Sequence, residues 1–297
     1  MARLVLAHPV FLADNSDEQA ASSPYFPLGL LYLAAWVRDH GHEVSIFDGT
    51  FAEGPEDFAA HLVAVEPDLV GISALVTSRD RAIDLARIAA ANGTSVVMGG
   101  PDPTVDPGWY MAHPEVDLVV HHEGEQTIAR LLDLVDEGLF DIEHLAVEDG
   151  IAFRVDNHLK VNRPRQPIED LDSLPTPARD LIDTDRYLHM WRDDSGYTSM
   201  TVATSRGCPY GCEWCADAVH GEQFRQRSPE SVAAEMTELK ASLGVDSIRL
   251  VDDVDALDRS FFDQLADAVG PGANVTFEPL DRIVRDDLPL LEVRDSL

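Results

Sequence analysis

Short apolar runs alternate with longer segments of helical periodicity along the first 140 residues. The runs are continuous and rich in Val and Ile, which is typical of strands buried on both faces. They occupy residues 3–7, 43–47, 68–73, 95–100 and 117–122. The segments between them repeat apolar residues at helical spacing, and several end in Gly; they occupy residues 28–41, 55–65, 78–93 and 124–138. The sequence therefore predicts an α/β unit, in which helices cover both faces of a parallel sheet and ligands bind at the carboxyl ends of the strands.

The pattern weakens over residues 141–197, which we interpret as a linker. A small hairpin is expected around residues 155–158, and the Pro-rich stretch after it cannot sustain a long helix or a central strand. Beyond it, the pattern predicts three strands and one helix in the order of a βα barrel: strands over 197–208, 246–253 and 274–280, and a helix over 228–244. The predicted domains are thus residues 1–140 and 198–297, on either side of the linker.

All three cysteines of the chain lie in one short loop after the first of these barrel strands. Cys208, Cys212 and Cys215 have the spacing C-x3-C-x2-C. Three thiolates on one loop can ligate three irons of a [4Fe–4S] cluster and leave the fourth iron open. Zinc is an alternative, with His220 as the nearest candidate for a fourth ligand. A redox pair formed by Cys212 and Cys215 is a further alternative, but it leaves Cys208 without a role.

The charge balance excludes one large class of function. The formal net charge is -32, from 22 basic and 54 acidic residues, and only two of the basic residues are lysines, Lys160 and Lys240. A phosphate backbone would be repelled over most of such a surface, so general nucleic-acid binding is not expected. The acidic excess resembles that of proteins from a salt-rich cytoplasm, although an ordinary acidic protein is the alternative.

The N-terminal segment and the overall hydropathy predict a cytoplasmic protein. Residues 1–15 contain one Arg and a short apolar run without a small-residue cleavage site, so they predict a first strand and no signal peptide. No apolar stretch approaches the roughly 20 residues that a membrane span needs.

Two of the predicted strand ends carry residues suited to a large flat ligand. The third strand ends in Ser73-x-Leu75 and the fourth in Gly99-Gly100. Paired glycines let a backbone approach a ligand closely, and a small hydroxyl residue leaves room while offering one hydrogen bond. The alternative is that both motifs are ordinary turns chosen for their backbone conformation.

Together with residues 27–44 and 121–127, these strand ends resemble the cobalamin-binding domain of B12-dependent radical S-adenosylmethionine (SAM) enzymes. The resemblance implies a Rossmann-like domain over residues 1–140. The cobalamin contacts that it implies are Ser73, Leu75, Gly99, Gly100, Thr104, Glu123 and Gly124.

One part of that family's pattern is absent. The Asp-x-His-x-x-Gly signature, which supplies a histidine to cobalt, is replaced by His-Pro-Val-Phe-Leu at residues 8–12. The resemblance therefore implies cobalamin bound without a protein imidazole on cobalt. We expect capping or packing for His8, and structural or solvent-facing roles for His121 and His122.

The cysteine loop resembles the defining motif of the radical SAM superfamily. Trp214 stands directly before Cys215, as the aromatic residue does in C-x3-C-x-aromatic-C, and the resemblance implies a cofactor contact for it. It also implies that SAM chelates the open iron and that one electron then yields a 5′-deoxyadenosyl radical. We expect Arg225, Arg227 and Asp253 either to line the barrel mouth or to form surface ion pairs.

These resemblances imply a radical SAM enzyme that binds cobalamin, a [4Fe–4S] cluster and SAM. Methyl transfer to an unactivated carbon or phosphorus of a small-molecule substrate is the expected reaction, with ferredoxin or flavodoxin as electron donor. The alternatives are ring-forming oxidation of a porphyrin-like substrate, as in anaerobic magnesium-protoporphyrin monomethyl ester cyclase, and a non-catalytic cobalamin carrier or sensor. About 90 residues follow Cys208, fewer than the family's barrel contains. We therefore expect a partial barrel, in a fragment or in a truncated product that a second polypeptide completes.

Overall fold

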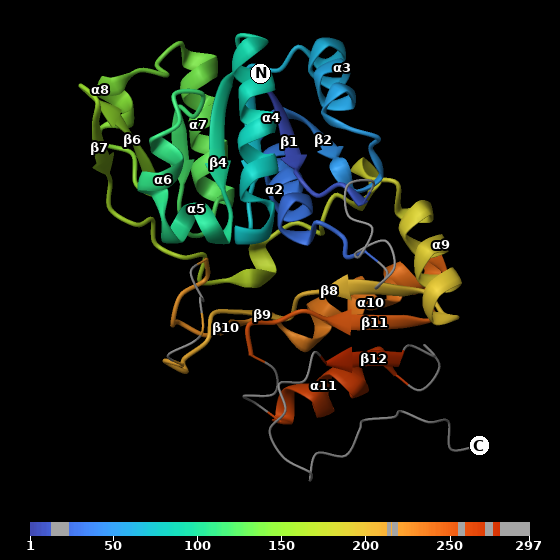
Figure 1. The fold of residues 1–297 in the computed structure, drawn as a ribbon. Helices are drawn as coiled ribbons and strands as arrows, with labels where there is room; N and C mark the ends of the chain where they lie inside the picture. The colour runs from blue at the N-terminus through green and yellow to red at the C-terminus, as the bar shows by residue number, and fades with distance from the viewer. Residues whose placement is uncertain (13–23, 213–214, 216–218, 255–258, 271–275, 280–297) are drawn as a thin grey trace.

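The computed structural model describes residues 1–12, 24–212, 215, 219–254, 259–270 and 276–279. Within them the chain forms two α/β units, one above the other in Figure 1, with the yellow connecting segment between them. One prediction, the cofactor contact of Trp214, falls outside the described residues. No helix in the described part is long and apolar enough to cross a membrane.

The first unit contains a seven-stranded sheet in the order β2-β1-β3-β4-β5-β6-β7. The first five strands are parallel, whereas β6 and β7 are antiparallel to their neighbours. The strands are β1 (Arg3–His8), β2 (Glu43–Asp48), β3 (Leu69–Ser73), β4 (Ser95–Gly99), β5 (Leu118–Val120), β6 (Ile151–Val155) and β7 (His158–Val161). The parallel register pairs Ser73 with Gly99, so the two predicted ligand-binding strand ends lie side by side.

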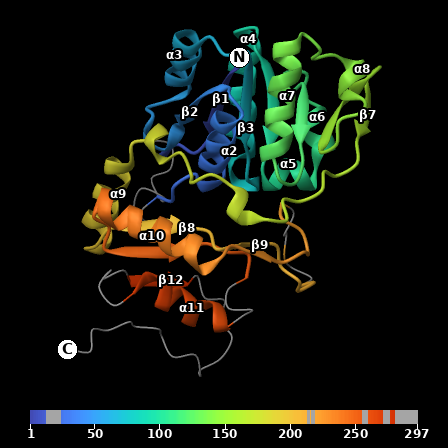
Figure 2. The same ribbon diagram turned by 180° about the vertical axis from the view of Figure 1, so that it is seen from behind.

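Helices cover both faces of this sheet, as the alternating pattern predicts. One apolar core includes residues of α2 (Leu28–Asp39) and α7 (Glu125–Glu137), and the other includes residues of α3 (Pro55–Val65), α4 (Arg79–Ala91) and α6 (Pro107–Met111). Figures 1 and 2 show the two helical layers from opposite sides. The unit also contains the short helices α5 (Pro101–Val105), α8 (Ile142–Leu145), η2 (Gly49–Phe51) and η3 (Val76–Ser78).

The predicted hairpin belongs to the first sheet. Its strands β6 and β7 extend that sheet beyond β5, through antiparallel pairs such as Val119 with Ala152. The sheet therefore continues past residue 140 into the segment interpreted as a linker. After Val161 the chain crosses to the second unit through η4 (Leu171–Ser173) and η5 (Arg179–Leu181) and then forms α9 (Thr184–Ser195).

The second unit contains a parallel sheet in the order β12-β11-β8, in agreement with the predicted start of a barrel. Its strands are β8 (Ser199–Val202), β11 (Ser247–Leu250) and β12 (Thr276–Pro279), and its helices are α10 (Pro229–Leu243) and α11 (Arg259–Val269). Ser228 caps α10, because its hydroxyl accepts a hydrogen bond from the Ser231 amide. A separate ribbon, β9 (Ser205–Arg206) with β10 (Arg225–Gln226), encloses the cysteine loop.

Candidate functional site

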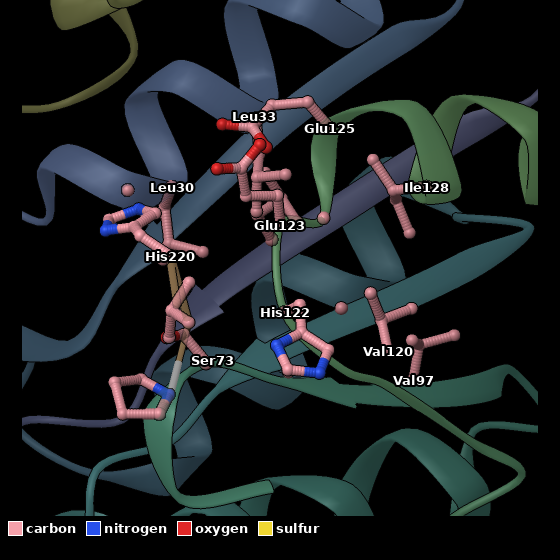
Figure 3. A pocket seen from close by; sticks show the side chains of 18 of the residues that line it. Leu30, Leu33, Ser73, Val97, Val120, His122, Glu123, Glu125, Ile128 and His220 are labelled. Atoms are coloured by element: carbon pink, nitrogen blue, oxygen red, sulfur yellow. The ribbon is translucent and has the colours of Figure 1, made fainter. Parts of the chain in front are cut away.

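A cavity of about 410 Å³ lies where the carboxyl ends of the first sheet meet the cysteine loop. Its volume is in the usual range for small-molecule sites, about 300–1,000 Å³. Most of its apolar lining comes from the sheet and from α2 and α7: Leu6, Leu30, Leu33, Ile72, Val97, Val120 and Ile128. The second unit contributes Arg206, Cys215, Val219, His220 and Asp253. In Figure 3 the side chains of Val97, Val120 and Ile128 lie on one side of the view and His220 on the other.

Five of the seven predicted cobalamin contacts line this cavity. They are Ser73, Gly99, Gly100, Glu123 and Gly124. The packing around the three glycines differs. A Cβ at Gly99 would meet only the Val120 carbonyl oxygen, at 3.7 Å, whereas a Cβ at Gly124 would lie 3.1 Å from Leu33 Cδ2. Gly99 is therefore the position where the backbone faces open cavity space.

The other two predicted contacts, Leu75 and Thr104, are not among the residues that line the cavity. The Leu75 side chain is 46% exposed. The Thr104 hydroxyl donates a hydrogen bond to the Gly100 carbonyl oxygen at 2.9 Å and accepts one from the His122 amide at 3.1 Å. Thr104 thus connects two loops of the cavity wall without facing the cavity.

The three cysteines differ in exposure along their loop. Cys208 is buried, Cys212 is half-buried and Cys215 is exposed. The Cys215 amide donates a hydrogen bond to the Cys212 carbonyl oxygen at 3.1 Å, so these two cysteines share one tight turn. Of the three, only Cys215 lines the cavity. Among the described residues no three His, Cys, Asp or Glu side chains converge to hold a single metal ion, but the cysteine ligands of a cubane bind different irons and need not meet at one point.

Two carboxylates at the end of β11 hold the start of the cysteine loop. Asp252 accepts hydrogen bonds from the Thr204 amide at 2.7 Å and from the Ser205 amide at 2.8 Å. Asp253 accepts one from the Gly207 amide at 2.7 Å. Gly207 has φ +83°, and a Cβ there would collide with the Gln223 backbone, so only glycine fits at this position. Sequence reasoning missed Asp252, since a strand-end Asp carries no distinctive signal.

Asp253 also binds His220, the residue considered as a zinc ligand. Its Oδ2 lies 2.8 Å from His220 Nδ1, and both residues line the cavity. Burial raises the pKa of Asp253, but the hydrogen bond and the charge of His220 outweigh it, so that the net pKa is lowered. The hydrogen bond holds the Nδ1 edge of the imidazole at the cavity wall.

The two arginines that sequence analysis left open are buried. Arg225 forms an ion pair with Glu123 at 2.6 Å, and Arg227 forms one with Glu235 at 2.5 Å. Their side chains are only 4% and 11% exposed, so the expectation of surface pairs is wrong for both. Asp253, which the sequence analysis grouped with these two arginines, does line the cavity.

The three histidines near the strand ends have separate environments. Burial lowers the pKa of His8, which is paired in register with Asp48 and is not part of the cavity lining. His121 is buried, and burial lowers its pKa as well. His122 has φ +63°, a left-handed conformation that is uncommon outside glycine. Because it also lines the cavity, the expectation that it simply faces solvent does not describe it fully.

Comparison with known proteins matches residues 20–132 to the B12 binding domain family. An uncharacterized methyltransferase of Pyrococcus horikoshii is 34% identical, over 78% of this chain and 50% of its own length. An anaerobic magnesium-protoporphyrin IX monomethyl ester cyclase of Synechocystis is 27% identical, over 99% of this chain and 57% of its own length. The chain therefore spans about half the length of these two relatives.

A solved structure has the same fold. It is the radical S-adenosylmethionine methyltransferase TsrM from Kitasatospora setae, with tryptophan and a SAM analogue bound. The TM-score is 0.70 at 19% identity, and the match covers 89% of this chain and 50% of that one. The likeness includes both units and extends the correspondence beyond the B12 binding domain.

Proposed function

From the premise that the chain belongs to the cobalamin-dependent radical SAM family, we propose that it binds cobalamin in the cavity and a [4Fe–4S] cluster on Cys208, Cys212 and Cys215. The observation that carries the proposal is the shared cavity. Its wall contains both the strand ends that resemble a cobalamin site and Cys215 with its neighbours Val219 and His220. A ligand in the cavity would therefore lie directly against the cluster loop.

The lining fits a large cofactor with an apolar portion. The walls beside α2 and α7 are apolar, and Gly99 presents backbone without a side chain. Glu123, His122 and Ser73 place polar groups around this apolar lining, an arrangement that orients a ligand through few hydrogen bonds. Leu30, Leu33 and Ile128 would exclude water from the buried part of the ligand.

The proposed reaction is radical methyl transfer to carbon or phosphorus of a small-molecule substrate. When bound, the cluster, SAM and cobalamin supply the radical and methyl chemistry, and the protein supplies ligation and orientation. In that division Asp252 and Asp253 hold the cysteine loop at its base, and Asp253 orients His220 toward the bound groups.

Ring-forming oxidation of a porphyrin-like substrate is the second candidate. It is favoured by the cyclase relative, which matches 99% of this chain. A ferredoxin- or flavodoxin-type donor belongs to both proposals, because each cleavage of SAM consumes one electron. A second polypeptide, a cytoplasmic location and adaptation to high salt are further proposals that rest on the sequence alone.

Anaerobic reconstitution tests the proposal. The protein should hold about four irons, bind cobalamin, and release 5′-deoxyadenosine from SAM under dithionite. Methylated product would favour methyl transfer, and an oxidised ring product would favour the cyclase reaction. Cobalamin and cluster binding without 5′-deoxyadenosine would instead favour a carrier or sensor. Stoichiometric zinc without iron would contradict the cluster assignment.

A further inference from the structure

The cysteine loop begins and ends in a two-stranded ribbon with an unusual charge pattern. In this antiparallel ribbon Arg206 of β9 is directly opposite Arg225 of β10. Arg206 stands two positions before Cys208, so the ribbon fixes the base of the cluster loop. Like charges directly opposite each other destabilise a strand pair. Nearby negative charge would therefore stabilise the ribbon.

That charge comes from the other unit, from the turn Glu123-Gly124-Glu125 at the start of α7. Arg206 Nη2 donates a hydrogen bond to Glu125 Oε1 at 2.6 Å, and Arg225 Nη2 lies 2.6 Å from Glu123 Oε1. Arg206 Nη1 lies 3.7 Å from Glu123 Oε2, which joins the two pairs into one network. Arginine stays cationic in proteins, so each of the two guanidinium groups needs a counter-charge at this buried position.

All four side chains are at most 8% exposed. Removing charged groups from water is costly, so a balanced buried network adds little to stability, whereas removal of one partner leaves a charge uncompensated. A network of this kind favours one arrangement of its two halves over all others. Glu123 also accepts a hydrogen bond from the Ile168 amide at 2.9 Å, which ties in the connecting segment.

We infer that Glu123 and Glu125 are positioning residues that lock the cysteine loop over the cavity through Arg206 and Arg225. The inference rests on the proposed function, since it takes the loop as the cluster site and the cavity as the cobalamin site. Glu123, Gly124 and Glu125 line the cavity as well. The same turn therefore borders the cobalamin site and sets the distance and orientation of the cluster relative to it.

The first test is hydrogen exchange of the chain without cofactors, in the variants Glu125→Gln and Glu123→Gln. Each substitution keeps the size of the side chain but leaves one arginine uncompensated. Amides of residues 205–207 and 225–226 should exchange at least about tenfold faster than in the parent protein. Arg225→Lys, which keeps the charge, should have a smaller effect. Unchanged exchange in both Gln variants would overturn the inference.

A matched control breaks an exposed ion pair between the first unit and the connecting segment. Asp180 of η5 binds Arg38 of α2 at 2.7 Å, but both side chains are largely exposed. Asp180→Asn should leave exchange in the ribbon within twofold of the parent. Equal acceleration in this control would mean that the loss of any ion pair made by the first unit loosens the ribbon, and the specific positioning role would fail.

The second test measures position directly. In the protein loaded with reduced cluster and cob(II)alamin, electron paramagnetic resonance reports the dipolar coupling between the two spins. Glu125→Gln should broaden or shift that coupling in the molecules that hold both cofactors; an unchanged coupling would overturn the inference. If the parent protein took up neither cofactor, the proposed function would fail, and the exchange experiment alone would decide whether the glutamates lock the loop.

Discussion

Gly100 packs against Ser73 so closely that a Cβ on Gly100 would lie 2.8 Å from Ser73 Oγ. The same Cβ would lie 3.1 Å from the Ala74 carbonyl oxygen, and Gly100 has φ +96°, which L side chains rarely adopt. The two motifs that predict a cobalamin site are therefore in contact with each other. Glycine at position 100 is therefore needed so that the loops after β3 and β4 can pack against each other.

Substitution of Gly100 should consequently destabilise the protein even without cofactor. Gly100→Ala combines a strained backbone with a steric conflict, and we expect a loss of about 2 kcal/mol in the free energy of unfolding. Urea denaturation of the cofactor-free chain measures it. Gly100→Val would be worse, so loss of cobalamin binding in that variant does not distinguish a ligand contact from misfolding. Unchanged stability of Gly100→Ala would contradict the contact with Ser73.

Gly99 gives the cleaner test of a ligand contact. A Cβ there makes only an ordinary contact with the Val120 carbonyl oxygen, so Gly99→Ala should fold with nearly parental stability. Because Gly99 lines the cavity, the added methyl group would occupy space that bound cobalamin needs, and affinity should fall at least about tenfold. Titration followed by cobalamin absorbance measures the affinity.

The control for Gly99→Ala is Gly108→Ala. A Cβ at Gly108 would meet Asp106 Oδ1 and Leu159 Cδ2, both at 3.6 Å, and Gly108 is not part of the cavity lining. Cobalamin affinity should be unchanged in this variant. If the Gly99 and Gly108 variants bound cobalamin with equal affinity, the Gly-Gly motif would be an ordinary turn and not a cobalamin contact.

The first sheet was predictable because its strands are buried on both faces and their apolar runs are continuous. The helix α9 was not. Its apolar residues Tyr187, Leu188 and Trp191 span little more than one turn between the charged residues at 185–186 and 192–194, and the Pro-rich stretch before it suggested irregular structure. The place of β6 and β7 in the first sheet was also missed, because a hairpin sequence predicts its own turn but not the strand it pairs with.

The residues of the site that belong to short sequence motifs could be predicted, and the others could not. Ser73, Gly99 and the cysteines have recognisable spacing, whereas Arg206 and Glu125 are 81 positions apart and look like ordinary charged residues in the sequence. Only the folded chain places them together in a buried pair. Leu75 is not among the residues that line the cavity and its side chain is largely exposed, so its predicted cobalamin contact stays a prediction.

The cysteines should be required together. Cys208→Ala, Cys212→Ala or Cys215→Ala should each remove most of the iron from the reconstituted protein, because a cubane needs all three thiolates from this loop. Iron analysis and the thiolate-to-iron absorption band measure it. His220→Ala separates the alternatives, since a zinc site that used His220 would lose its metal, whereas the cluster should retain its iron. Loss of zinc but not iron in the cysteine variants would contradict the cluster.

Acid should weaken one buried contact of the first unit selectively. Hydrogen bonds from Arg79 at 2.6 and 2.7 Å, and one from Tyr110 at 2.5 Å, hold the pKa of Asp102 below its ordinary value of 3.8. The stability that this carboxylate contributes is present above about pH 4 and is lost as the pH falls through its lowered pKa. Asp102→Asn should cost about 2 kcal/mol at pH 7 and progressively less below pH 4. A cost independent of pH, measured by urea unfolding, would contradict the assignment.

Bound cob(II)alamin should carry no histidine nitrogen on its lower face. The chain lacks the Asp-x-His-x-x-Gly loop, and His8, which stands at the corresponding strand end, is not part of the cavity lining. Electron paramagnetic resonance should therefore show no triplet splitting from a protein imidazole. His122 and His220 are the residues that could contradict this, because both line the cavity. A triplet that persists in His8→Asn but disappears in His122→Ala or in His220→Ala would show that the substituted histidine binds cobalt, and a triplet that survives all three changes would point to the cofactor's own base.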